Sequence, residues 1–132
     1  MKYAYTAILS PIEDGSGFYC RVPDIIGCIS SGKDLPDAIA MITDAAAGCL
    51  CVLEDENVSI PTPTPQIDIK HDANDIVTII QLDTLAYRAA NDKRAVRKNV
   101  SLPAWMSKLA DQRRVNCSQV LQDGLMKIFE SA

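Results

Sequence analysis

Three polar side chains at alternate positions near the C-terminal end have the chemistry to recognise DNA bases. Arg97, Asn99 and Ser101 alternate with Val100 and Leu102, and this period of two predicts a short strand with its polar side chains on one face. Arg97 can donate two hydrogen bonds to guanine, Asn99 can pair with adenine, and Ser101 is less selective. A ribbon of two such strands fits the major groove of DNA. The alternative is an ordinary surface strand.

Two short helices are predicted to follow this strand and to require a second copy of the chain. After Pro103, a first helix places Met106, Leu109 and Ala110 on one side. Beyond a break near 115–116, a second helix has an apolar face made of Val120, Leu121, Leu125, Ile128 and Phe129. Two copies can bury these faces by pairing their strands above four packed helices. We therefore expect a homodimer formed through residues 93–132.

A second set of residues is expected to contact DNA phosphates. Lys98 is predicted to lie at the end of the ribbon, within reach of a phosphate. Asn116 is expected to cap the second helix, with Gln119 as its reciprocal partner. The free backbone amides of Cys117 and Ser118 would then point at a phosphate, because a helix N-terminus favours anions.

The charge distribution agrees with DNA binding by the C-terminal part alone. Residues 1–92 carry 5 basic and 14 acidic residues, a net charge of −9, and residues 93–132 carry 8 basic and 3 acidic residues, a net charge of +5; together they give −4. An acidic body with a basic C-terminal unit indicates that only this unit meets nucleic acid. We place the linker at residues 88–95, which are polar and lack a clear pattern.

The N-terminal part is predicted to combine a sheet with one long helix. Short apolar runs at 3–9, 18–22 and 28–31 predict an antiparallel meander, and 76–82 predicts the strongest strand. Between them, Asp34 and Asp37 predict a capped helix whose apolar stripe, from Leu35 to Leu53, covers the sheet. The proline-rich segment 60–65 predicts an extended loop. The fold class is α+β, with domains at 1–92 and 93–132.

The cysteines and the single histidine do not indicate a metal or redox site. The cysteine count is odd, no C-x-x-C pair occurs, and His71 lies apart from the five thiols of Cys20, Cys28, Cys49, Cys51 and Cys117. We therefore expect reduced, mostly buried thiols in a cytoplasmic protein, with no metal and no cofactor. No signal peptide or membrane span is predicted.

Catalysis by the N-terminal part is not expected. A two-metal nuclease needs several converging carboxylates, and the run 3–9 contains none. Asp37 is explained by helix capping and Asp44 by a solvated helix face, while Asp24 is expected to bond nearby backbone amides in its turn. No catalytic residue is predicted.

Both parts of the chain resemble known domains. Residues 93–132 resemble the ribbon-helix-helix DNA-binding domain, through Asn99–Pro103 and the helix start at 116–119. Residues 1–65 resemble the HicB-type antitoxins. This resemblance rests on six segments, which are Tyr3–Leu9, Gly17–Phe18, Pro23–Cys28, Ser31–Gly32, Leu35–Ala38 and Ile60–Pro63.

The resemblance implies the antitoxin of a type II toxin-antitoxin pair. The N-terminal domain would have a partial RNase H-like fold and would occlude a HicA-type, mRNA-cleaving toxin. The C-terminal domain would bind operator DNA and repress the operon, and dimers lying side by side would form a tetramer. The sequence does not indicate which residues contact the toxin. The open alternative is a ribbon-helix-helix repressor whose N-terminal domain senses a small ligand.

Overall fold

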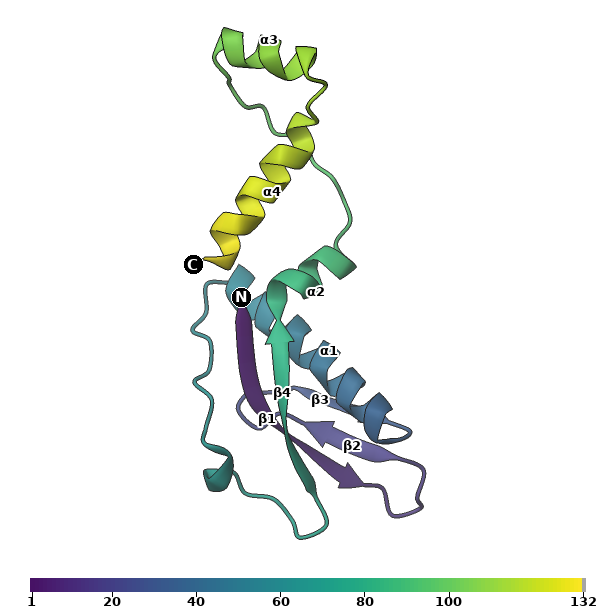
Figure 1. Cartoon of the computed structure of the whole chain (residues 1–132). Coiled ribbons are helices and arrows are strands. Elements are labelled where there is room, and N and C mark those ends of the chain that lie inside the picture. Colours follow the sequence, from purple (N-terminus) through teal and green to yellow (C-terminus); the bar gives the residue numbers. More distant parts are fainter. Residues whose placement is uncertain (132) are drawn as a thin grey trace. The chain divides into compact units, whose positions relative to one another are not determined.

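A four-stranded antiparallel sheet forms the body of the N-terminal part (Figure 1). In the computed structural model, which describes residues 1–131, the strands are β1 (Lys2–Pro11), β2 (Phe18–Arg21), β3 (Ile29–Gly32) and β4 (Ile76–Asp83). Their order is β3-β2-β1-β4, and each neighbouring pair is antiparallel. The predicted meander is confirmed, and β4 pairs with the free edge of β1.

The long helix α1 (Leu35–Asp55) covers one face of this sheet. The Asp34 carboxylate accepts a hydrogen bond from the Asp37 amide at 2.9 Å, as predicted for the cap. The Asp37 carboxylate accepts from the amide of Lys33 at 3.0 Å, one residue before the position that a capping box would use. The start of the helix is therefore fixed on both sides of Asp34.

The core lies between α1 and the sheet. At every fourth position of α1, Ala38, Ile42, Ala46 and Leu50 are fully buried. They pack against the strand residues that point to the same side, which are Tyr5, Ala7, Leu9, Cys20, Ile80 and Leu82. By length and hydropathy alone α1 could cross a membrane, but this packing accounts for its apolar character.

Residues 84–91 form a helix, α2 (Thr84–Asn91), which corrects the placement of the linker at 88–95. Asp83 caps α2 by accepting hydrogen bonds from the amides of Leu85 and Ala86 at 3.1 and 3.2 Å. The helix approaches α1 closely at Gly48, where an added Cβ atom would lie 3.0 Å from the Tyr87 hydroxyl. Glycine at this position therefore allows the two helices to meet.

A network centred on Glu54 joins β1, α1 and α2. The Tyr3 hydroxyl donates to one carboxylate oxygen of Glu54 at 2.8 Å, and the Thr84 hydroxyl donates to the same oxygen at 3.1 Å. Arg88 donates to the other oxygen at 3.2 Å and pairs with Asp55 at 2.9 Å. Burial, and then the hydrogen bond to Glu54, raise the pKa of Tyr3 to about 12. The network therefore holds the end of α1 against the start of the chain.

The loop between α1 and β4 contains a short 3-10 turn, η1 (Gln66–Asp68), and is fixed to the sheet. The Tyr5 hydroxyl donates to the carbonyl of Pro61. The two carboxylate oxygens of Asp24 accept from the Thr64 amide at 2.9 Å and from the Thr64 hydroxyl at 2.6 Å. This corrects the expectation that Asp24 bonds nearby amides, because its partner lies 40 residues along the chain.

Replacing Asp24 with alanine should lower the free energy of unfolding of residues 2–92 by about 1–2 kcal/mol, since two hydrogen bonds to a partly buried carboxylate are lost. The change can be measured as a shift in the urea midpoint, followed by the near-ultraviolet circular dichroism of the tyrosines. The control is Asp14→Ala, because Asp14 is exposed and bonds locally, accepting from the amide of Ser16, two residues away. Equal midpoints for both variants would show that the Asp24–Thr64 contact adds nothing.

The C-terminal part consists of an irregular segment and two helices, α3 (Ala104–Gln112) and α4 (Cys117–Glu130). The chain forms two compact units, and the division lies between Asp92 and Lys93. Below, they are called the N-terminal unit and the C-terminal unit.

Candidate functional site

The residues predicted to contact bases lie in the segment that precedes α3. Residues 92–103 are neither helix nor strand, and Arg97, Asn99 and Ser101 are all exposed. In the part of this single chain that the structure describes, no strand pairs with the segment. A two-stranded ribbon would take its second strand from another copy, so base contact by these residues stays a prediction.

The N-terminus of α4 has the expected cap. The Asn116 side chain accepts a hydrogen bond from the Gln119 amide at 3.1 Å. The Gln119 side chain donates to Asp123 at 2.9 Å, which corrects its expected role as the reciprocal capping partner. Cys117 and Ser118 are the first two residues of α4 and are exposed, and amides at such positions have no acceptor within the helix. They can therefore donate to an anion from outside.

The turn between α3 and α4 is tight and well defined. Arg114 has a left-handed backbone (φ 54°), and its amide donates to the carbonyl of Asp111 at 3.2 Å, while the amide of Val115 donates to that of Ala110 at 2.9 Å. This pair of bonds is a Schellman motif, a common helix end. It stops α3 at the predicted break and sets the direction in which α4 begins.

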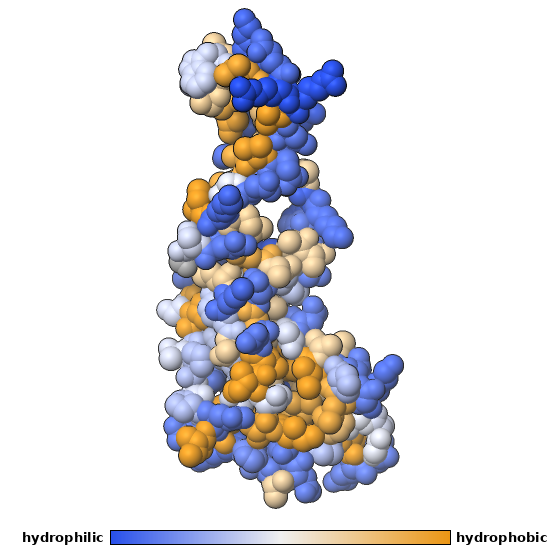
Figure 2. Space-filling model, in the orientation of Figure 1, coloured by the Kyte–Doolittle hydropathy of each residue, from blue (hydrophilic) through white to orange (hydrophobic). Residues whose placement is uncertain are grey.

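The C-terminal unit has no buried core of its own. Among residues 93–131, all are exposed except Ala110, which is half-buried. The exposed set includes the whole predicted apolar face of α4, namely Val120, Leu121, Leu125, Ile128 and Phe129. Figure 2 shows apolar side chains at the visible surface of this unit, around α3. Trp105, in the first turn of α3, is also exposed, at 63%. Exposed apolar side chains gathered in this way are typical of a surface that binds another protein, a membrane or a ligand.

The carboxylates considered for catalysis do not gather into a metal centre. Asp24 binds Thr64, Asp37 caps α1, and Asp44 is exposed on α1. Among residues 1–131, no group of three or more histidine, cysteine, aspartate or glutamate side chains is placed to hold a metal ion. The cysteines of this part of the chain are free thiols; Cys20, Cys28 and Cys51 are buried, Cys49 is half-buried and Cys117 is exposed.

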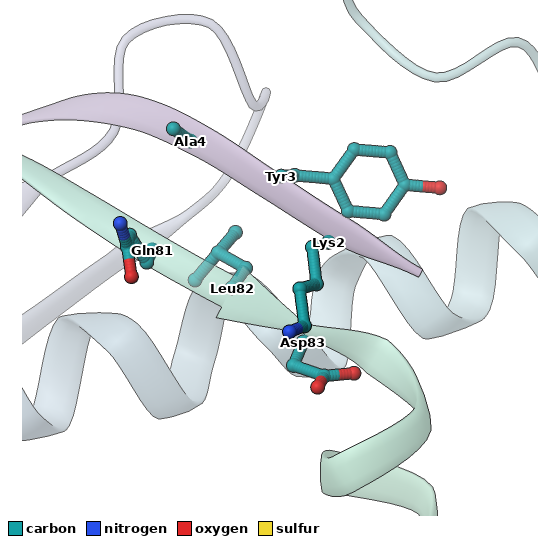
Figure 3. A pocket seen from close by; sticks show the side chains of 6 residues that line it. All are labelled: Lys2, Tyr3, Ala4, Gln81, Leu82 and Asp83. Carbon is teal, nitrogen blue, oxygen red and sulfur yellow. The ribbon is translucent and has the colours of Figure 1, made fainter. Parts of the chain in front are cut away.

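An open pocket lies at the end of the β1–β4 pair. It has a volume of about 630 Å³, and six residues line it, which are Lys2, Tyr3, Ala4, Gln81, Leu82 and Asp83. Lys2 and Asp83 are register partners, and Figure 3 shows their side chains at the end of the two strands. The Tyr3 hydroxyl is already bonded to Glu54, and Asp83 caps α2. Both polar groups therefore serve the fold.

Sequence patterns did not identify the polar residues that shape the N-terminal unit. The Tyr3–Glu54–Arg88 network and the Asp24–Thr64 contact join positions 34 to 51 residues apart. Only the capping potential of Asp83, followed by six helix-forming residues, offered a local signal for α2.

Comparison with known proteins gives one family and several similar structures. The profile of a family described as HicB-like antitoxin of bacterial toxin-antitoxin system matches residues 5–124. No curated protein matches the sequence.

Three solved structures illustrate the likeness in fold. A chain of a toxin-antitoxin complex from Streptococcus pneumoniae has a TM-score of 0.63 and 18% identity, over 96% of this chain and 99% of that one. The antitoxin HicB of Burkholderia pseudomallei has a TM-score of 0.55 and 22% identity, over 96% and 98%. A chain of the HicA3 and HicB3 toxin-antitoxin complex has a TM-score of 0.51 and 22% identity, over 61% and 99%.

Proposed function

Because the chain belongs to the HicB-like antitoxin family of bacterial toxin-antitoxin systems, we propose that it performs two tasks with its two units. The N-terminal unit binds and occludes a HicA-type, mRNA-cleaving toxin. The C-terminal unit dimerises as a ribbon-helix-helix domain, binds operator DNA and represses the operon. The complexes whose folds resemble this chain pair an antitoxin with a toxin, which supports the first task.

The second task is supported above all by the exposed apolar face of α4 in a unit without a buried core. Such a unit gains a core when a second copy covers α3 and α4. The same pairing would bring two copies of the segment 97–103 together, with Arg97, Asn99 and Ser101 directed at the major groove. Lys98 and the amides of Cys117 and Ser118 would then contact phosphates. Two dimers side by side would form the tetramer.

In the proposed mechanism, the toxin is neutralised by steric cover, without catalysis or a cofactor. A ribonuclease must offer cationic groups to the RNA backbone. The N-terminal unit, with a net charge of −9, attracts such a surface and speeds encounter. We assign the sheet and α1 to a partial RNase H-like fold that acts as a binding scaffold, and we place the protein in the cytoplasm.

Co-expression with the adjacent small open reading frame tests the proposal directly. The neighbour alone should arrest growth, and this chain should restore growth and co-purify with the neighbour. A reporter driven by the operon's promoter should be repressed by the same chain. Absence of both arrest and complex would overturn the antitoxin function and would leave a DNA-binding regulator whose N-terminal unit binds something else.

A further inference from the structure

An apolar groove lies between the end of α1 and the turn that joins β2 to β3. Its volume is about 400 Å³. Cys49, Val52 and Leu53 of α1 line one side, Ile25 and Ile26 of the turn line the other, and Val58 follows the helix. None of these six side chains carries a charge, so the groove suits an apolar ligand group.

The turn holds Ile26 outward in a fixed position. Ile26 is 99% exposed, whereas its neighbour Ile25 is buried in the core. The turn is closed by hydrogen bonds from the amides of Ile25 and Cys28 to the carbonyls of Val22 and Ile25, at 3.1 and 3.2 Å, and Gly27 supplies the positive φ of +77°. The contact of Asp24 with Thr64 anchors the turn from outside. A large apolar side chain held outward on such a turn is available for contact with a partner protein.

The other side of the groove is equally well fixed. The helix α1 ends in a Schellman motif, with Asn57 in the left-handed region (φ 55°). The amide of Asn57 donates to the carbonyl of Glu54 at 3.2 Å, and that of Val58 donates to the carbonyl of Leu53 at 3.0 Å. This motif commonly brings the side chains of its two end residues together, and here those residues, Leu53 and Val58, both line the groove. The groove is therefore present before any partner binds.

The charge around the groove favours a basic partner over a second copy of the chain. The two segments that form it, 23–27 and 49–61, contain four acidic residues and no basic residue. Arg88 offsets part of this charge by pairing with Glu54 and Asp55, while Glu56, two residues before the lining residue Val58, is exposed. Two copies meeting here would bring negative charges together and repel each other, whereas a cationic surface would be attracted to the negative charge.

From this combination we infer that the groove is the anchoring site for the toxin, and that it receives an apolar side chain from the toxin's basic surface. This inference rests on the proposed antitoxin function and assigns a place to the toxin contact. Ile26 is the central contact, and Val52 and Val58 flank it. The acidic residues of the segments 23–27 and 49–61 orient the partner.

The first test compares exposed isoleucines. Ile26→Asp should weaken binding of the purified neighbouring toxin about thirtyfold or more, as loss of an anchor residue does. The control is Ile67→Asp, because Ile67 is 92% exposed and does not line the groove; it should bind as the unchanged chain does. Circular dichroism of both variants should match that of the unchanged chain, since neither side chain is buried.

The second test uses the half-buried thiol of Cys49, which lines the groove, and needs no substitution. Alkylation of the full chain by N-ethylmaleimide, followed by peptide mass spectrometry, should show that the toxin slows modification of Cys49 severalfold. The exposed Cys117 in the C-terminal unit is the internal reference, and its rate should not change.

The possible outcomes separate the two levels of the proposal. If the unchanged chain does not bind the toxin at all, the antitoxin function itself fails, and the inference fails with it. If the chain binds the toxin but Ile26→Asp binds equally well, or Cys49 is not protected, the function stands and the inference is wrong. Protection of Cys49 that rises with chain concentration in the absence of toxin would identify a second copy as the occupant and would also overturn the inference.

Discussion

Replacing Arg97 with alanine should reduce operator affinity by at least about thirtyfold while toxin neutralisation is unchanged. One bidentate contact from arginine to guanine contributes about 1–3 kcal/mol of discrimination, and a symmetric dimer makes it twice, so the loss amounts to about 2–6 kcal/mol. Arg97 is exposed in the single chain, so its truncation should not disturb folding. Fluorescence anisotropy with the operon's own promoter DNA, at one fixed salt concentration, measures the effect.

The neighbouring position supplies the matched control. Lys98 is expected to contact a phosphate, so Lys98→Ala should weaken binding to operator DNA and to unrelated DNA alike. The slope of log affinity against log salt concentration should become shallower by about one for each lost contact. If Arg97→Ala also weakened both DNAs equally, Arg97 would be a phosphate contact and not a reader of bases. Failure of Arg97→Ala to rescue growth from the toxin would contradict the division of tasks between the two units.

Replacing Leu125 with aspartate should abolish dimerisation and, with it, operator binding. Leu125 lies in the middle of the apolar face of α4 and is 38% exposed in the single chain. In the proposed dimer each copy would bury one new carboxylate without a partner, and each such burial costs several kcal/mol. At micromolar concentration the variant should no longer associate through its C-terminal unit, which analytical ultracentrifugation measures. It should also show no detectable operator binding.

The control for this variant is Met126→Asp. Met126 is 37% exposed, nearly the same as Leu125, but helical geometry places it about 100° further around α4, outside the apolar face. The Met126→Asp variant should dimerise and bind operator DNA with nearly the same affinities as the unchanged chain. A dimer that survives Leu125→Asp would show that the apolar face of α4 is not the contact between copies.

The elements that depend on local pattern were predictable from the sequence. An apolar run predicted a strand at 76–82, which the structure contains as β4 (Ile76–Asp83). Helical spacing of apolar residues predicted α1. The cap at Asn116 was predictable because its partner, the amide of Gln119, is three residues away. In each case the pattern that predicts the feature lies within a short stretch of sequence.

The elements that depend on distant partners were not predictable in the same way. The helix α2 is only eight residues long, and its position depends on Tyr87 meeting Gly48 and on Arg88 pairing with Glu54. Aspartate commonly bonds to amides within its own turn, but the Asp24 carboxylate accepts hydrogen bonds from the amide and hydroxyl of the distant Thr64. The partner of the segment 97–103 is expected to be another chain, so one chain alone does not display the predicted strand. At Asp24 a tertiary contact therefore overrides the local turn preference of aspartate.

The absence of a buried core from the C-terminal unit has a consequence for how repression depends on the amount of protein. Because residues 93–131 have almost no buried side chains in one chain, folding and association of this unit would be a single equilibrium in the proposed dimer. When the dimer is a minor species, its concentration rises with the square of the chain concentration. Under the proposed function, transcription of the operon should therefore fall steeply over a narrow range of protein levels. Toxin neutralisation by the N-terminal unit should not depend on dimerisation and should proceed at protein levels below and above that range.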